Sequence, residues 1–395
     1  MQDIDSVPVG SGAAPAVPET RSRVLEIRFT GSGSEYFRIW AVNLLLILVT
    51  LGLYFPFAKA RRIRYFYANT LVDGQALSFH GDAWKMFRGF LLLIVLMGAY
   101  SAAGHLSPVA AIVAFLILCA VWPALWRASL QFRLGNTSWR GLRMRFDGSL
   151  KAAYLACAPS YLPAIALVGG ASLMDPEAMK AGGGFTPAVG VYMVGAACMM
   201  LLAPWSLALF KRYQHNGYRI AGQQSRVKLS VAEMYLLSLK VIGVSLPPML
   251  LMGLIVAAFT ALSTALDGPR ELRLAFVGLG VVLGYVVYFA IVMPYGAARL
   301  QNLVWNGTRS EVLAFRSQLK FRSLCRLTLK NWLLTLVTLG LYRPFAAVSA
   351  ARLRLQSVHI DSSSDPEHWV ATASAGHEDA TGEAAGDFFG IDMGL

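Results

Sequence analysis

The chain has 395 residues, of which 56% are hydrophobic and only 14% are charged. A soluble domain carries about 25% charged residues, so this composition excludes an ordinary soluble enzyme or binding module and indicates a membrane protein. The formal net charge of +13 does not require nucleic acid as a partner, because an excess of Lys and Arg on one side of a membrane explains it better.

The chain begins with a polar stretch of small residues. Residues 1–22 are rich in Pro, Gly, Ser and Ala, and we predict that they are disordered. They lack the basic start, the short apolar core and the cleavage site of a signal peptide. The first apolar segment is therefore expected to act as an uncleaved insertion signal.

Six apolar runs approach or exceed the roughly 20 residues that cross a bilayer as a helix. Of the 35 Lys and Arg, only Lys180, Arg270 and Arg273 fall in three of the connections, at 105–107, 174–185 and 264–273. Basic connections stay in the cytoplasm, so these three loops are expected outside. The predicted spans are residues 88–104, 108–126, 152–173, 186–209, 241–263 and 274–293.

A unit of strand, membrane segment, Pro, basic helix and turn recurs five times. In each copy a Pro closes an apolar run and a basic, aromatic stretch follows, as in "PFAKARRIRYFYANT" from Pro56. Four copies then reach an Asn, which predicts a turn because Asn tolerates left-handed backbone. The predicted hinge and turn residues are Pro56, Pro123, Pro204, Pro294 and Pro344, with Asn69, Asn136, Asn216 and Asn306.

Each unit also carries a short stretch in which apolar and polar residues alternate, the pattern of a half-buried strand. The stretches adjoin the basic connections, so we expect one small sheet on the cytoplasmic face. They are residues 24–31, 76–81, 142–148, 225–230 and 311–317.

One apolar sequence occurs twice. "NLLLILVTLGLYFPFA" at 43–58 returns as "NWLLTLVTLGLYRPFA" at 331–346, with thirteen of sixteen positions identical. A single span at each place would put the first strand and the last arginines outside, against the charge rule. We therefore favour two re-entrant or interfacial hairpins, at 37–58 and 325–346, that turn near "TLGLY" and meet as a matched pair. The alternative is eight plain spans with both termini outside.

Polar groups at membrane depth are few. The six predicted spans contain no internal Asp, Glu, Lys or Arg, which argues against a proton-coupled carrier. The candidate polar residues are Asn43, Thr50, Asn331 and Thr338 in the twin segments, which either bond helix to helix or line a pathway. No His or Cys stands at metal-ligand spacing, and no catalytic motif is present.

The stretch "NLLLILVTLGLYFPFAKARRIRYFYANT", followed by "LVDG" and "LSFHG", resembles the YjgN-like family of bacterial inner-membrane proteins, whose function is unknown. The resemblance covers residues 24–357 and is most specific at 43–81. It implies a multi-pass inner-membrane protein and supplies no substrate and no catalytic residue. The chain departs from the family after Pro344, where "QSVHIDSS" replaces an Asn-Thr turn.

These observations predict an all-α polytopic protein of the cell inner membrane, with six spanning helices, two short re-entrant or spanning segments, internal repeats and a small cytoplasmic β element. The predicted domains are a disordered segment 1–22, a five-repeat membrane domain 23–358 and an acidic disordered tail 359–395.

For function we expect passive transport or channel-like permeation of a small molecule, and as the alternative a noncatalytic scaffold or lipid-interacting protein. We expect no enzyme activity and no cofactor. The expected partner is the lipid bilayer, through anionic headgroups on the basic stretches. The residues name no small-molecule ligand and no oligomeric state.

Overall fold

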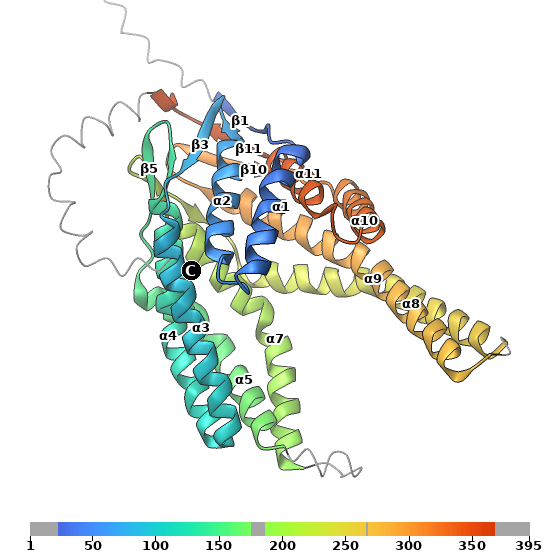
Figure 1. The fold of residues 1–395 in the computed structure, drawn as a ribbon. Coiled ribbons are helices and arrows are strands. Elements are labelled where there is room, and N and C mark those ends of the chain that lie inside the picture. Colours follow the sequence, from blue (N-terminus) through green and yellow to red (C-terminus); the bar gives the residue numbers. More distant parts are fainter. Residues whose placement is uncertain (1–22, 175–185, 266–267, 368–395) are drawn as a thin grey trace, which may run out of the picture.

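The computed structural model describes residues 23–174, 186–265 and 268–367, and most of this part is helical (Figure 1). The predictions for residues 1–22 and for the tail from residue 368 fall outside it. The helices are α1 (Gly33–Val49), α2 (Phe55–Ala68), α3 (Ala83–Leu106), α4 (Pro108–Gly135), α5 (Leu150–Ser172), α7 (Pro187–Asn216), α8 (Val231–Ala265), α9 (Arg270–Gly307), α10 (Phe321–Val337) and α11 (Arg343–Leu355).

Consecutive helices pack as five hairpins, α1–α2, α3–α4, α5–α7, α8–α9 and α10–α11. The three middle hairpins consist of six helices that are long and apolar enough to cross a membrane, which confirms the six predicted spans and the polytopic class. The first and last hairpins are shorter, because their helices have 13 to 17 residues. At 1.5 Å per residue these helices reach only about 20–25 Å. Each twin segment therefore turns back on itself, as predicted.

The sheet is larger than the small element that we predicted, because a short strand follows each second helix. The five alternating stretches do form strands, and they pair through these short strands, which hold only two to five residues. The strands are β1 (Arg23–Phe29), β2 (Thr70–Val72), β3 (Gln75–Phe79), β4 (Thr137–Trp139), β5 (Leu142–Phe146), β6 (Tyr218–Ile220), β7 (Gln223–Gln224), β8 (Arg226–Val227), β9 (Thr308–Arg309), β10 (Leu313–Ser317) and β11 (Val358–Ser362).

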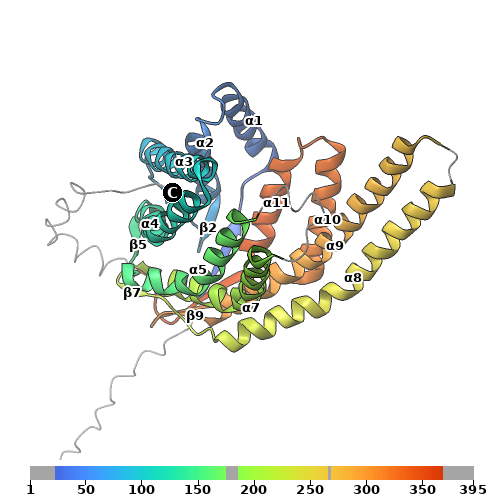
Figure 2. The same ribbon diagram turned by 90° about the horizontal axis from the view of Figure 1, so that it is seen from below.

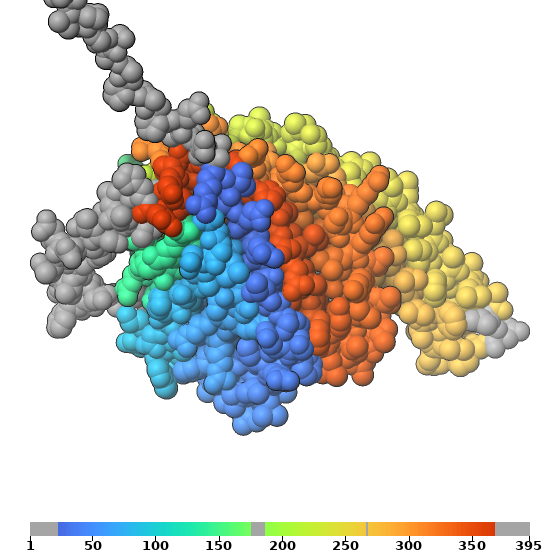
Figure 3. All heavy atoms as spheres, turned by 90° about the horizontal axis from the view of Figure 1, so that it is seen from above, coloured from blue at the N-terminus to red at the C-terminus, as the bar shows by residue number. Residues whose placement is uncertain are grey.

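The strands form a nearly closed antiparallel ring. Their order is β7-β6-β5-β4-β3-β2-β1-β11-β10-β9-β8, and only Ser225 separates β7 from β8 at its two ends. β1 illustrates how neighbouring repeats are joined: its first residues pair with β11 of the last repeat, and its later residues pair with β2. Figure 3 shows the first repeat, in blue, against the last, in red and orange. The five hairpins thus follow one another around a common centre (Figure 2).

Apolar side chains fill the middle of the sheet ring. Leu25 on β1, Trp139 on β4 and Ile360 on β11 are buried together in one cluster, and Ile220 on β6 and Phe315 on β10 pack against it. Burying each such side chain contributes about 1.5–3 kcal/mol. The cluster therefore plugs the ring at the end where all five repeats join.

Asn69 and Asn136 stand in turns, as predicted, but each also caps the helix before it and lacks the left-handed backbone that we expected. Asn69 and Asn136 have φ of −96° and −95°, outside the left-handed region. Their Nδ2 groups donate to the carbonyls of Tyr65 and Phe132, at 2.9 and 2.7 Å. The left-handed turns come later, at Asp73-Gly74, Arg140-Gly141 and Ala221-Gly222, with the two positive φ values of a type I′ hairpin.

The two remaining Asn residues lie in the last turn of a spanning helix. Asn216 accepts from the Val227 backbone N–H at 2.8 Å, and Asn306 accepts from that of Ser317 at 2.6 Å. The turn prediction is therefore wrong for Asn216 and Asn306, which are helical, and their side-chain oxygens accept from backbone N–H groups of the strands β8 and β10.

The five Pro residues do not share one role. Pro123, Pro204 and Pro294 lie inside the helices α4, α7 and α9, which continue through them, and a hinge at these positions stays a prediction. Pro56 and Pro344 stand in the first turn of α2 and α11, where a backbone N–H would have no helical partner. The interior Pro residues persist because one lost hydrogen bond is tolerated among packed apolar helices.

The last strand shifts one predicted boundary. β11 pairs with both β1 and β10, so residues 359–362 belong to the sheet and not to the tail that we placed from 359 onward. The stretch "QSVHIDSS" keeps the alternation of buried and exposed residues that a strand needs. Its loss of the Asn does not prevent pairing, because the cap is not part of the ladder.

A side-chain contact recurs wherever one repeat passes to the next. A polar side chain of each second helix donates to a backbone carbonyl between the first helix of the next repeat and the strand that precedes that helix. Four of these donors are arginines of the basic stretches, for which we had expected lipid headgroups as partners. The pairs are Arg64 with Gly81 (2.9 Å), Arg127 with Gly148 (2.8 Å), Arg212 with Leu229 (2.6 Å), Asn302 with Leu319 (3.0 Å) and Arg352 with Gly31 (2.8 Å).

Candidate functional site

The twin hairpins contain the four polar residues that the sequence analysis selected. Asn43 and Asn331 are both 6% exposed. Asn43 Oδ1 accepts from Arg61 Nη1 at 3.5 Å, and Asn331 Nδ2 donates to Ser349 Oγ at 3.2 Å. Each partner lies 18 residues after its Asn, so the two hairpins use equivalent positions. Each Asn therefore joins the two helices of its own hairpin.

Thr50 and Thr338 hold the hairpin turns. Thr50 Oγ1 donates to the Leu46 carbonyl at 2.7 Å and accepts from the Tyr54 N–H at 2.9 Å. Thr338 makes the same two contacts, with Leu334 at 2.6 Å and Tyr342 at 3.0 Å. Each of the four candidates thus forms hydrogen bonds within its own hairpin, and the structure does not join the four into a shared polar path.

The tips of the twin hairpins are apolar and almost fully exposed. Leu51 and Leu339 have φ of 51° and 49°, and each is followed by a Gly with φ above 90°. Their exposed fractions are 94% and 93%. A leucine exposed to this degree is unfavourable in water and favourable among lipid chains. The tips therefore suit insertion into the membrane.

The twin hairpins also touch each other. Phe37 on α1 and Phe345 on α11 have ring centroids 5.8 Å apart. The Phe345 ring packs directly against Gly33, so a Cβ at position 33 would overlap the ring. The first and last repeats are thus neighbours, as the matched sequences predicted.

A large apolar groove lies between α3, α4, α5 and α7, with a volume of about 420 Å³. Two of its polar groups bond to backbone: the Tyr161 hydroxyl donates to the Cys119 carbonyl at 2.6 Å, and Ser160 Oγ donates to the Cys157 carbonyl at 2.7 Å. The lining is otherwise aliphatic and aromatic, and it includes Met97, Tyr100, Phe115, Trp122 and Met199.

A second cavity of about 270 Å³ continues the groove toward α2. The two cavities share Leu93, Trp122 and Leu125, so they adjoin at these side chains. Lys59 lines the second cavity. Burial, and after it the positive charge of Arg133, lowers the pKa of Lys59, although its side chain remains exposed to solvent. The groove and the second cavity together therefore extend from an apolar end to the exposed cation of Lys59.

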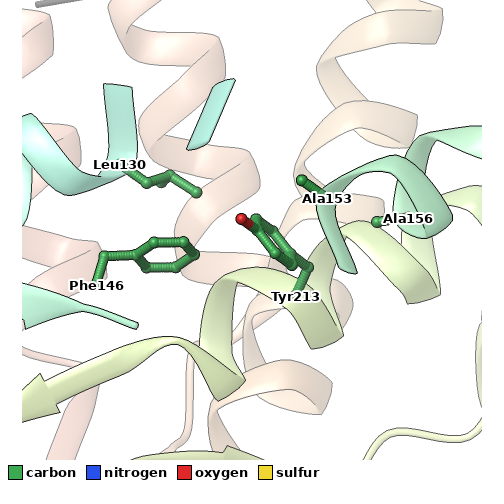
Figure 4. Close-up of a cluster of buried hydrophobic side chains, with 5 residues drawn as sticks. All are labelled: Leu130, Phe146, Ala153, Ala156 and Tyr213. Atoms are coloured by element: carbon green, nitrogen blue, oxygen red, sulfur yellow. The ribbon is translucent and has the colours of Figure 1, made fainter. Parts of the chain in front are cut away.

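A packed cluster fixes the helices that form the groove. Figure 4 shows Tyr213 of α7 lying between Leu130, Phe146 and the small side chains of Ala153 and Ala156. Ala153 is completely buried, so no larger residue fits where α5 approaches α7. Removing packed atoms from such a cluster costs about 2–5 kcal/mol. The groove is thus bounded by rigidly spaced helices.

This groove was not predicted from the sequence. In a spanning helix nearly every position is apolar, so the residues of an inner cavity do not differ in type from those that face lipid. Lys59 stands among other cations of a basic stretch, and nothing in the sequence separates it from them. In the part of the chain that the structure describes, no three His, Cys, Asp or Glu side chains lie close enough together to hold a metal ion.

Comparisons with known proteins agree with this architecture. Residues 24–388 match the family described as "Bacterial protein of unknown function (DUF898)". The "Inner membrane protein YjgN" of Salmonella typhimurium (strain LT2) is 32% identical over 127 residues, and that of Escherichia coli O157:H7 is 30% identical over 145 residues. These alignments cover 32% and 36% of this chain, and 32% and 35% of the relatives. The chain thus matches about a third of the relatives' length. No solved structure matches it.

Proposed function

We propose that this chain, which belongs to the DUF898 family of bacterial proteins of unknown function, is a noncatalytic lipid-interacting protein that holds an acyl chain of a membrane lipid. The chain is a multi-pass protein of the inner membrane. The observation that carries this proposal is the apolar groove between α3, α4, α5 and α7.

The chemistry of the groove selects the occupant. Sites for small molecules usually enclose about 300–1,000 Å³ and carry a few polar groups that orient the ligand. Here the polar groups of Ser160 and Tyr161 already donate to backbone carbonyls. A sugar, a nucleotide or a hydrated ion would leave its own polar groups unpaired at this depth. An acyl chain has none to satisfy.

The second cavity gives the occupant a direction. It continues the groove to Lys59, where an ammonium group meets solvent. A lipid whose chain lies against Trp122 would have its headgroup near this cation. Basic side chains near the membrane surface attract anionic headgroups by about 1 kcal/mol each. The proposed ligand is therefore an anionic lipid, and the proposed partners are lipids and not nucleic acid.

Passive permeation, the first function that we expected, has less support. A channel of this design would pass along the centre of the ring, where Leu25, Trp139 and Ile360 pack together. The polar side chains that suggested a pathway bond within their own hairpins.

Native mass spectrometry of the full chain in detergent, with phosphatidylglycerol added, tests the proposal. Ala164 lines the groove, whereas Leu162 on the same helix is 78% exposed. Ala164→Trp fills the groove and is expected to abolish lipid retention, and Leu162→Trp is the matched control that should retain lipid as the wild type does. Equal retention by all three proteins would contradict the proposal.

A further inference from the structure

The second helices of the five repeats present one face toward the centre of the ring. Counted from the Pro that the repeats share, the positions three, seven and ten residues later lie on one side of a helix. Four cations and one amide occupy them. They are Lys59 on α2, Arg133 on α4, Lys211 on α7, Gln301 on α9 and Arg354 on α11.

The cations on this face lie near enough for their charges to act on one another. Arg133 acts on both Lys59 and Lys211. Lys211 also interacts with Arg354, although α7 and α11 belong to the third and fifth repeats, which are not neighbours in the ring. This last interaction crosses the interior, as the arrangement in Figure 2 allows.

No acid balances these charges among the described residues. The ion pairs of that part of the chain involve the carboxylates of Asp73, Asp147, Asp361, Asp365 and Glu367, and none of them includes one of the four cations.

Neutral amides hold two of the cations instead. Arg354 Nε donates to Gln301 Oε1 at 2.9 Å, and Lys211 Nζ donates to Gln214 Oε1 at 3.2 Å. Amides fix the position of a cation and leave its charge in place.

The cations remain open to a ligand. Lys59, Arg133 and Arg354 are exposed and Lys211 is half-buried, and the apolar plug of the sheet ring closes the end of the ring where the repeats join. Positive charge that no acid compensates, beside a low-dielectric wall, concentrates anions.

We propose that Lys59, Arg133, Lys211 and Arg354 form a binding site for a phosphate group on the axis of the ring. Charges that come from four repeats surround a compact multivalent anion better than a carboxylate, which one Arg fork satisfies. The phosphate group belongs either to a free phosphate or pyrophosphate or to a lipid headgroup. The site does not depend on an acyl chain in the groove.

Calorimetric titration of the full chain with inorganic pyrophosphate, in neutral detergent without phosphate buffer, is the first arm of the test. Arg133→Gln and Lys211→Gln should each weaken binding about tenfold, the loss of one charge-assisted hydrogen bond. The control is Arg143→Gln on β5, which removes an exposed cation outside the set. Without ligand, Arg133→Gln should unfold at the wild-type temperature or above, because it removes repulsion.

The second arm compares retention of phosphatidylglycerol and phosphatidylcholine in nanodiscs. Pyrophosphate binding that the two variants lose identifies a free anion, and selective retention of phosphatidylglycerol that they lose identifies a lipid phosphate. If neither ligand distinguishes these variants from wild type, or if Arg143→Gln weakens binding equally, the site is overturned. Ala164→Trp separates the two proposals, since it should remove the lipid chain and leave pyrophosphate binding unchanged.

Discussion

Arg352 and Gly31 lie 321 positions apart in the sequence, and the Arg352 guanidinium donates a hydrogen bond of 2.8 Å to the Gly31 carbonyl. The bond joins the last repeat to the first by the same contact that joins the other repeats. Together with the pairing of β1 and β11, it makes the five hairpins a closed arrangement and not a row with two ends.

Arg352→Gln should loosen this closure. Losing a hydrogen bond from a charged donor to a carbonyl lowers the free energy of unfolding by about 1–2 kcal/mol. Unfolding in detergent, followed by tryptophan fluorescence, measures the change. Arg322→Gln, which removes an exposed arginine at the start of α10, should change stability by less than about 0.5 kcal/mol. Equal effects of the two variants would deny the contact a role in closing the ring.

Gly340 should tolerate no side chain, although nothing lies within 4 Å of where a Cβ would be. Its φ of +94° strains any L-residue, and Gly340→Ala is expected to lose about 1–2 kcal/mol. Gly98→Ala is the matched control, since Gly98 also faces open space but lies in the middle of α3. It should gain about 0.5–1 kcal/mol from helix propensity. Changes of the same sign in the unfolding free energy would show that the hairpin turn is not formed as described.

Asp73 should contribute more to the free energy of unfolding than Asp147 does. Asp73 is 13% exposed and pairs with both Arg23 at 3.0 Å and Arg140 at 2.6 Å. Asp147 is 33% exposed and pairs with Arg219 at 2.8 Å. We expect Asp73→Asn to lower the unfolding free energy by about 1–3 kcal/mol, and Asp147→Asn by less than about 1 kcal/mol. Chemical denaturation of both variants at one salt concentration checks the order, and a reversed order would refute it.

The sequence predicted the parts of the fold that rest on periodicity and length. Runs of apolar residues located the six long helices, and alternation located β1, β3, β5 and β10. The repeat of "TLGLY" located both hairpin turns, because a left-handed Leu-Gly pair ends each helix there. These signals are local, so a single segment of chain is enough to express them.

The features that we predicted wrongly or missed depend on contacts between distant segments. Strands such as β9, with two residues, are too short for a period, and only their pairing identifies them. Asn69 suits a turn and a helix cap equally well until the helix end is known. The groove and the set of central cations exist only once the repeats close into a ring, so residues such as Lys59 and Trp122 carried no separate signal.

We propose that all five hairpins return to one face of the membrane, and the side on which the C-terminus lies tests this most directly. Paired reporters, one active in the cytoplasm and one active outside, would be fused after Leu395 so that β11 stays intact. We predict a cytoplasmic C-terminus, because the last hairpin brings β11 back beside β10. An external C-terminus would mean that residues 325–346 simply span the membrane, and it would contradict the ring.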